Sequence, residues 1–263
     1  MSEWLAVIIL GIIEGITEFL PISSTGHLLL AEQWLPKQSE LFIIVIQSGA
    51  VLAVIPLFRD RFYQFIFKWR EPNTRDYLAK IAAAFLITGA GGLAMKKAGL
   101  ELPETVWPIA VALILGGLAF LFIEFKLKGR TLKSEITWAM ALTVGAAQLL
   151  AAAFPGTSRS GACILLLLLL GLSRPLAAEF AFLVGIPTML AAGGYEILKA
   201  LRHPAADATP ENWSMVALGF VSSAIVSFIA VKWLLRYIQT HTFVVFGWYR
   251  IGLGLVVLLL LAR

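Results

Sequence analysis

Two acidic residues, Glu14 and Glu18, lie four positions apart in an otherwise apolar stretch. Residues at this spacing share one face of a helix. A carboxylate within a bilayer is costly and usually faces a cavity or a partner, and two on one face repel unless a cation or protons lie between them. Because hard oxygen ligands suit Mg²⁺ or Ca²⁺, the pair predicts a divalent metal site. The alternative is that one or both carboxyl groups are protonated and hydrogen-bonded to neighbouring helices.

A turn of small polar residues follows this acidic pair. Pro21 ends the first helix, and the next helix opens with Ser23, Ser24, Thr25 and Gly26. Such a turn presents free backbone N–H groups and the positive end of a helix dipole to an anion. Serine and threonine are also ordinary N-cap residues, so a simple cap is the alternative. We expect the turn to bind phosphate.

Ser24 and His27 are three positions apart, close enough to approach each other across one helical turn. A hydroxyl beside an imidazole or a carboxylate is the general form of an activated nucleophile. The pattern predicts that Ser24 attacks, with His27 or Glu18 as its base. Attack by His27 itself or by water remains open, as does a packing role for His27.

A second polar segment repeats the first one about half a chain later. A shift of 134 positions places Gly145, Gln148, Pro155, Thr157 and Ser158 on Gly11, Glu14, Pro21, Ser23 and Ser24. A duplicated polar element in a hydrophobic chain is typical of a repeat-built membrane site.

The second segment carries a cation where the first carries acids. Arg159 lies at its tip among Thr157, Ser158 and Ser160, with apolar residues on both sides. The planar guanidinium suits phosphate oxygens. The alternative is an internal salt bridge to Glu14 or Glu18, which a substrate could displace. We expect these residues to bind phosphate.

The composition is that of a polytopic membrane protein. Of the 263 residues 59% are hydrophobic and 14% charged, and the mean hydropathy is +0.86, whereas soluble domains average about 45–50% apolar and roughly 25% charged residues. The net charge of +5 indicates cytoplasmic loops rather than a nucleic-acid partner. The single cysteine, Cys163, excludes an internal disulfide.

A bilayer core about 30 Å thick needs about 20 apolar residues per spanning helix. Six segments meet this requirement: 41–58, 77–95, 108–125, 176–198, 215–234 and 243–262. Residues 4–30 and 136–172 are apolar but broken by polar turns, which predicts re-entrant helical hairpins whose backbone is shielded by protein. The stretch from Arg59 to Lys80 is expected to be the longest polar loop, facing lipid headgroups.

The order of these segments predicts an all-α, single membrane domain of two inverted repeats, about 1–130 and 131–263. Each repeat has one hairpin and three spans, so the second is upside down and the hairpin tips meet near the midplane. Residues 59–75, 126–133, 174 and 232–236 hold twelve Lys and Arg, against six at 37, 96–97, 199–202 and 263. The first face is therefore expected to be cytoplasmic, and the first hairpin to enter from outside.

Two carboxylates, several hydroxyls, a histidine and an arginine together suit phosphoryl transfer or hydrolysis. A site at membrane depth implies a bilayer partner and a lipid with a phosphate head as substrate. Inverted repeats also build transporters, so transport or flipping of an anion or lipid phosphate is the alternative, with Glu14 and Glu18 coupling protons. A structural scaffold leaves these polar groups unexplained.

Residues 14–27 and 155–161 resemble the two signatures of the undecaprenyl-pyrophosphate phosphatase family, also called the bacitracin-resistance family. The likeness extends over the chain, including 42–49, 179–187 and Tyr249-Arg250-Ile251. It implies removal of the terminal phosphate of undecaprenyl pyrophosphate, which recycles the carrier lipid for peptidoglycan and other cell-wall polymers. It also implies a divalent metal and a site on the periplasmic face of the bacterial inner membrane.

The resemblance also assigns roles to particular residues. It implies that Glu14 and Glu18 are the family's acidic pair and that Ser24 and His27 are the catalytic serine and histidine. It also implies that Ser158 and Arg159 are the phosphate-binding pair. The chain departs from the family pattern at Cys163, where threonine is usual, and a thiol is the poorer donor. Phosphate could then bind more weakly or use Ser160. The glycines of 89–92 and 116–117 allow close helix packing within one chain or in a homodimer.

Overall fold

The computed structural model describes residues 2–100, 105–202 and 212–261, and this part of the chain is helical with one isolated β-bridge, Lys133 to Leu172. Residue 262, the last of the expected span 243–262, and Arg263, one of the six Lys and Arg counted on the second face, lie outside the described residues. The helices are α1 Glu3–Thr17, α2 Ser24–Ala31, α3 Glu40–Val54, η1 Ile55–Phe58, α4 Arg59–Phe67, α5 Pro72–Lys97, α6 Val106–Leu127, α7 Trp138–Ala153, α8 Arg159–Leu169, α9 Arg174–Arg202, α10 Trp213–Tyr237 and α11 Val244–Leu261.

Five of the six expected spans correspond to helices long and apolar enough to cross a bilayer. They are Glu40–Phe67, Pro72–Lys97, Val106–Leu127, Arg174–Lys199 and Trp213–Tyr237. The sixth expected span is α11, which is apolar but shorter over Val244–Leu260. The chain is thus a multi-pass membrane protein of helices.

The loop predicted from Arg59 to Lys80 is wrong. The first span continues through η1 into α4, and Pro72 opens α5, so most of this stretch is helical. The reason is an apolar pair at helical spacing, because Phe62 and Phe65 pack against the main core. Proline at the first turn of α5 is favourable because it lacks only an N–H that the helix cannot use.

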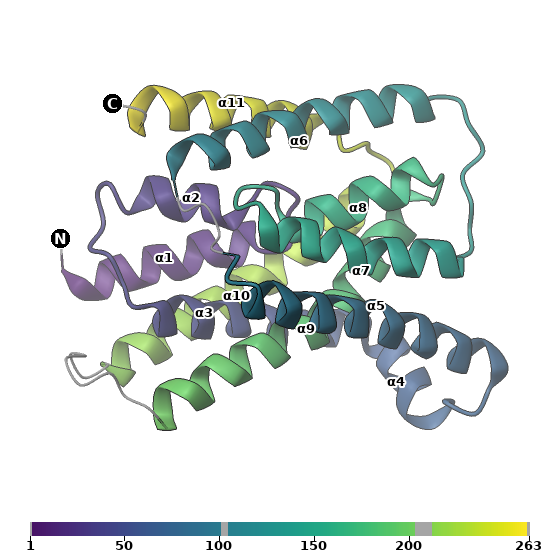
Figure 1. Ribbon diagram of the computed structural model, residues 1–263, viewed down its shortest axis with the longest axis horizontal. Helices are drawn as coiled ribbons and strands as arrows, with labels where there is room; N and C mark the ends of the chain where they lie inside the picture. Colours follow the sequence, from purple (N-terminus) through teal and green to yellow (C-terminus); the bar gives the residue numbers. More distant parts are fainter. Residues whose placement is uncertain (1, 101–104, 203–211, 262–263) are drawn as a thin grey trace.

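The two expected hairpins are present as α1 with α2 and α7 with α8. Each first helix is too short to span, since 15 and 16 residues at 1.5 Å each reach about 23 Å. In Figure 1, α1 runs inward from the end that holds both chain termini, and α7 runs inward from the opposite end. The two turns therefore approach each other in the middle of the molecule.

Helix pairs exchange partners between the two halves of the chain. α1 packs along α10, α7 packs along α5, and α6 packs along α11. Glycines let the backbones approach, because a Cβ at Gly11 would lie 2.6 Å from the Gly219 carbonyl and one at Gly145 would lie 2.9 Å from Ile87 Cβ. Gly11 and Gly145 correspond under the predicted shift of 134, and Glu14 and Gln148 are likewise both buried.

Beyond the turns, however, the predicted alignment is wrong by one residue. The N-cap residues of α2 and α8 are Ser23 and Ser158, which have nearly the same unusual backbone, with φ of 72° and 66°. Their separation is 135, because the second turn takes one extra residue at Gly156, where φ is +89°. Ser24 therefore corresponds to Arg159 rather than to Ser158.

The glycines at 116 and 117 pack within the chain. A Cβ at Gly117 would lie 2.6 Å from the Gly247 carbonyl of α11, and one at Gly116 would lie 2.3 Å from Arg250 Nη2. In α5, a Cβ at Gly91 would lie 2.4 Å from Leu149 Cδ1, whereas a Cβ at Gly92 would meet nothing within 4 Å. The homodimer stays a prediction.

Replacing Gly15 by alanine should destabilise the protein, because the new Cβ would lie 2.6 Å from the Ser223 backbone carbonyl of α10. Overpacking of this kind costs about 1–3 kcal/mol. Gly92→Ala is the matched control, since its Cβ meets nothing within 4 Å and alanine favours a helix by about 0.5–1 kcal/mol. Thermal unfolding of both variants in one detergent should place Gly15→Ala below wild type and Gly92→Ala at or above it. A Gly15→Ala variant as stable as wild type would contradict the packing of α1 on α10.

Candidate functional site

Glu18 joins the two hairpins at their tips. Its Oε2 accepts a hydrogen bond from Ser24 Oγ at 3.0 Å, and its Oε1 accepts one from Arg159 Nη2 at 3.2 Å. The Glu18 and Arg159 side chains are 7% and 16% exposed. The structure thus brings three sequence-predicted residues from two distant segments into one contact.

Arg159 uses only part of its hydrogen-bonding capacity in this contact. Its guanidinium lies 5.9 Å from the centre of the Phe19 ring, and its Nη1 is buried with no hydrogen-bond partner among the described residues. Gly185 of α9 makes room for it, because a Cβ there would lie 1.8 Å from Nη1. A buried donor without an acceptor is costly, so Nη1 is available to a second anionic oxygen.

Glu14 lies one helical turn before Glu18 and is fully buried. Its carboxyl group lies beside Glu18 and Gln47, yet neither oxygen has a hydrogen-bond partner in the described part of the chain. Two unsatisfied buried carboxylate oxygens next to a second carboxylate fit a bound cation or a proton. No cluster of three or more His, Cys, Asp or Glu occurs among the described residues, so the protein would supply these two acids.

His27 does not contact Ser24, and that predicted pairing is wrong. The His27 Nδ1 lies 2.7 Å from the Ser23 carbonyl oxygen, and its Nε2 lies 2.7 Å from the Tyr249 hydroxyl. Both ring nitrogens are therefore engaged. The three-residue spacing did not bring Ser24 and His27 together, because each side chain has another partner. His27 binds the carbonyl of the N-cap residue Ser23, four positions before it, and the Ser24 hydroxyl binds Glu18.

Two serines of the second turn bind protein groups. Ser158 caps α8, because its Oγ accepts a hydrogen bond from the Gly161 N–H at 3.2 Å. The Ser160 Oγ lies 3.2 Å from Ser158 Oγ and donates to the Leu20 carbonyl at 3.3 Å. Ser160 therefore connects the second hairpin to the first turn.

The remaining predicted phosphate-binding residues have different surroundings. Ser23 is buried, Thr25 is exposed at the first turn of α2, and Thr157 is partly buried. Gly26 packs against α6, where a Cβ would lie 3.0 Å from Leu113 Cδ1. Of these four residues, Thr25 is therefore the most accessible to an outside ligand.

Arg250 of α11 holds both turns, and the residue-by-residue reasoning missed it. It is fully buried, and it donates to the Pro21 carbonyl at 3.3 Å and to the Gly156 and Thr157 carbonyls at 3.1 and 3.0 Å. A further bond at 3.2 Å reaches the Ala112 carbonyl of α6. The available signals were an arginine inside an apolar run and its place in the Tyr249-Arg250-Ile251 motif.

Cys163 contacts the other helix of its own hairpin. It is fully buried in α8, and its Sγ lies 3.9 Å from the Val144 carbonyl of α7. The thiol thus fills space between the two helices of the second hairpin, and weaker phosphate binding at this position stays a prediction.

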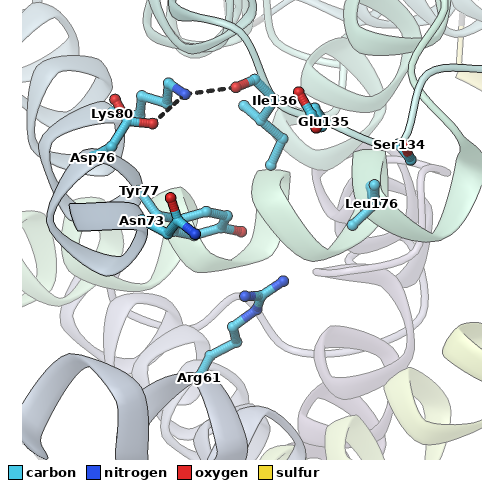
Figure 2. Close-up of a pocket in the computed structure, with 9 residues that line it drawn as sticks. All are labelled: Arg61, Asn73, Asp76, Tyr77, Lys80, Ser134, Glu135, Ile136 and Leu176. Carbon is cyan, nitrogen blue, oxygen red and sulfur yellow. Dashed lines mark hydrogen bonds and ion pairs between the residues drawn. The ribbon is translucent and has the colours of Figure 1, made fainter. Parts of the chain in front are cut away.

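A separate cavity of about 340 Å³ lies between α4, α5, α9 and residues 134–136 (Figure 2). Its cations are already paired, since Arg61 lies 2.8 Å from Glu179 and Lys80 lies 2.5 Å from Asp76. It contains no residue of either hairpin tip. The candidate site is therefore the hairpin contact rather than this cavity.

Comparisons with known proteins agree on one family. The model of the family described as bacitracin resistance protein BacA matches residues 7–256. A protein of Rhizobium etli (strain ATCC 51251) is 54% identical over 97% of this chain and 96% of its own length. Proteins of Xylella fastidiosa (strain 9a5c) and Xanthomonas oryzae pv. oryzae (strain PXO99A) are 50% and 48% identical over 98% of this chain and 98% and 97% of their lengths. All three are named undecaprenyl-diphosphatase.

Replacing Arg250 by methionine should destabilise the protein by about 3–5 kcal/mol, because it leaves several buried carbonyls without a donor. Arg250→Lys should recover only part of this, since an ammonium cannot reach the same carbonyls as a planar fork. Thermal unfolding in detergent measures the effect, with the exposed Arg236→Lys as control. Equal unfolding temperatures for wild type and Arg250→Met would show that the turns do not need this residue.

Proposed function

Because the chain belongs to the bacitracin resistance protein BacA family, we propose that it is an undecaprenyl-diphosphatase, which hydrolyses undecaprenyl pyrophosphate to undecaprenyl phosphate and inorganic phosphate. The observation that carries this function is the contact of Ser24 and Arg159 with the two oxygens of Glu18. It combines a nucleophile, a base and a phosphate-binding cation. The names of the relatives favour this reading over a transporter or flippase.

The pyrophosphate binds between the hairpin tips. Arg159 has one unused N–H edge, and phosphate is a stronger bidentate partner for guanidinium than a shared carboxylate. The N-termini of α2 and α8 add oriented backbone dipoles. Arg159 therefore moves from Glu18 to the phosphate, and this exchange frees Glu18 Oε1.

Ser24 is the nucleophile and Glu18 is its base. The Ser24 Oγ forms a bond to the terminal phosphorus, the bond to the bridging oxygen breaks, and Glu18 passes the hydroxyl proton to the departing lipid phosphate. Water then attacks the phosphoserine, its proton goes to Glu18, and Ser24 regains a proton as inorganic phosphate leaves. The 3.0 Å hydrogen bond favours Glu18 over His27 as the base.

Glu14 and Glu18 would hold a divalent cation, Mg²⁺ or Ca²⁺. The two unpartnered oxygens of Glu14 support this assignment, and Mg²⁺ typically binds one or two carboxylates together with substrate phosphates. When bound, the ion neutralises negative charge on the phosphates.

The two halves of the chain form inverted repeats in the bacterial inner membrane, with the site open to the periplasm. The reciprocal pairing of α1 with α10 and of α7 with α5 supports the repeat, as do the matching N-caps at Ser23 and Ser158. The excess of Lys and Arg on the opposite face, twelve against six, supports the orientation. The prenyl tail lies among the lipid-facing helices.

Glu18→Gln, Ser24→Ala and Arg159→Ala should each lower phosphate release from undecaprenyl pyrophosphate by about 100-fold or more, because each removes a group that acts in the transition state. Purified protein in detergent, assayed for inorganic phosphate with Mg²⁺ or Ca²⁺, provides the measurement. Ser222→Ala is the control, since it removes a hydroxyl that bonds the Leu218 carbonyl of its own helix and no residue of either hairpin.

Two further observations test the same chemistry. A chelator should abolish release by wild type, and acid quenching should trap phosphate on Ser24. Wild-type rates in all three variants, with and without chelator, would refute the assignment. Phosphate trapped on His27 would show that His27, and not Ser24, is the nucleophile.

Gly185→Ala should lower activity without unfolding the protein. The new Cβ would lie 1.8 Å from Arg159 Nη1, which is the end of a flexible side chain, so the guanidinium moves and the backbone stays. A misplaced phosphate ligand costs about 100-fold. Gly194→Ala in the same helix is the control, because nothing lies within 4 Å of it. Full activity of Gly185→Ala at an unchanged unfolding temperature would show that Arg159 has no fixed position.

A further inference from the structure

Tyr249 and His27 form a contact between α11 and the first hairpin that the proposed reaction does not use. The Tyr249 hydroxyl lies 2.7 Å from His27 Nε2. The two rings are nearly parallel, at 7° with centroids 5.6 Å apart. Because these in-plane atoms are 2.7 Å apart in nearly parallel rings, the rings lie edge to edge, and the hydrogen bond is what holds His27.

The other nitrogen of His27 identifies what the contact acts on. A carbonyl oxygen only accepts, so the 2.7 Å contact to Ser23 requires a proton on Nδ1. In a neutral imidazole Nε2 is then the acceptor for the Tyr249 hydroxyl. The hydrogen bonds run from Tyr249 through His27 to the Ser23 backbone.

Ser23 needs such a support more than its counterpart does. Both Ser23 and Ser158 have positive φ, a strained conformation for a residue with a Cβ. Ser158 is secured by its own side chain, which accepts a hydrogen bond from Gly161 N–H, whereas the Ser23 side chain makes no cap bond. His27 supplies no acceptor for the free N–H groups of α2, but its bond to the Ser23 carbonyl restrains the same residue.

We propose that Tyr249 is a positioning residue, which acts through His27 on the strained Ser23 backbone and so directs the Ser24 hydroxyl to Glu18. Ser24 is the first residue of α2, directly after Ser23. A change in the Ser23 carbonyl direction therefore rotates Ser24 away from its 3.0 Å bond to Glu18. The inference rests on the proposed function only for its consequence for catalysis.

Tyr249→Phe keeps the ring and removes the hydroxyl, so kcat should fall roughly three- to tenfold, the effect of one neutral hydrogen bond. KM should stay unchanged, because the hydroxyl does not touch the substrate. Tyr63→Phe is the matched control on α4, where the ring is similarly exposed. Tyr249→Phe and His27→Ala should be non-additive, since both break the same chain of hydrogen bonds.

A spectroscopic measurement separates this inference from the proposed function, because it needs no substrate. The chain has three histidines, so ¹⁵N-histidine labelling gives few signals, and the His27→Ala variant identifies those of His27. Wild-type His27 should show a protonated Nδ1 and a bare Nε2. In Tyr249→Phe the Nε2 signal should shift and a second tautomer should appear, while Tyr63→Phe changes nothing.

Unchanged His27 signals in Tyr249→Phe would overturn the inference, whether or not the protein releases phosphate. A changed spectrum with an unchanged kcat would also overturn it, since the ring would then be held without effect on Ser24. Absence of phosphatase activity in the wild type, together with the expected spectral change, would refute the proposed function and leave the hydrogen-bonded chain in place.

Discussion

A single buried guanidinium fixes the distance between the two turns on which the site is built. Backbone carbonyls in a turn at membrane depth have neither a helix nor water to satisfy them. Arg250 donates to carbonyls of both turns. All of these hydrogen bonds form together only when both turns lie next to the Arg250 guanidinium. The Glu18–Arg159 contact depends on this arrangement, because its two residues come from different hairpins and share no secondary structure.

In the proposed reaction the ion pair between Glu18 and Arg159 matters for function more than for stability. Removing two charges from water costs several kcal/mol per ion, and the attraction between them often does no more than repay that cost. Here the pairing is also incomplete, because Arg159 Nη1 has no acceptor in the described structure. A phosphate offers more oxygens in the same geometry, so the free protein holds its cation in a position that an anionic headgroup improves. The pair therefore keeps the site ordered without making it inert.

The sequence was sufficient for features that follow from hydrophobicity and charge. The broken apolar stretches predicted both hairpins. The cost of lone charges in a bilayer made a salt bridge from Arg159 to Glu14 or Glu18 the alternative to phosphate binding, and the structure contains the pair with Glu18. The sequence failed where a choice among nearby partners decides the geometry. His27 binds the Ser23 carbonyl rather than Ser24, and one extra residue at Gly156 changes the repeat register, which no periodicity reveals. The role of Arg250 depends on carbonyls from distant segments, and a single sequence does not show which segments converge.

The corrected register explains how two similar hairpins produce an asymmetric site. Ser24 and Arg159 each follow an N-cap of the same backbone conformation, so one copy presents a hydroxyl where the other presents a guanidinium. The first helices differ in the same way. Glu14 of α1 corresponds to Gln148 of α7, whose amide donates to Thr88. Under the proposed roles, two copies of either turn would supply two nucleophiles or two cations, and neither set performs phosphoryl transfer alone. The proposed reaction therefore needs both the contact of the two tips, which Arg250 supports, and the side-chain difference that divides the roles between them.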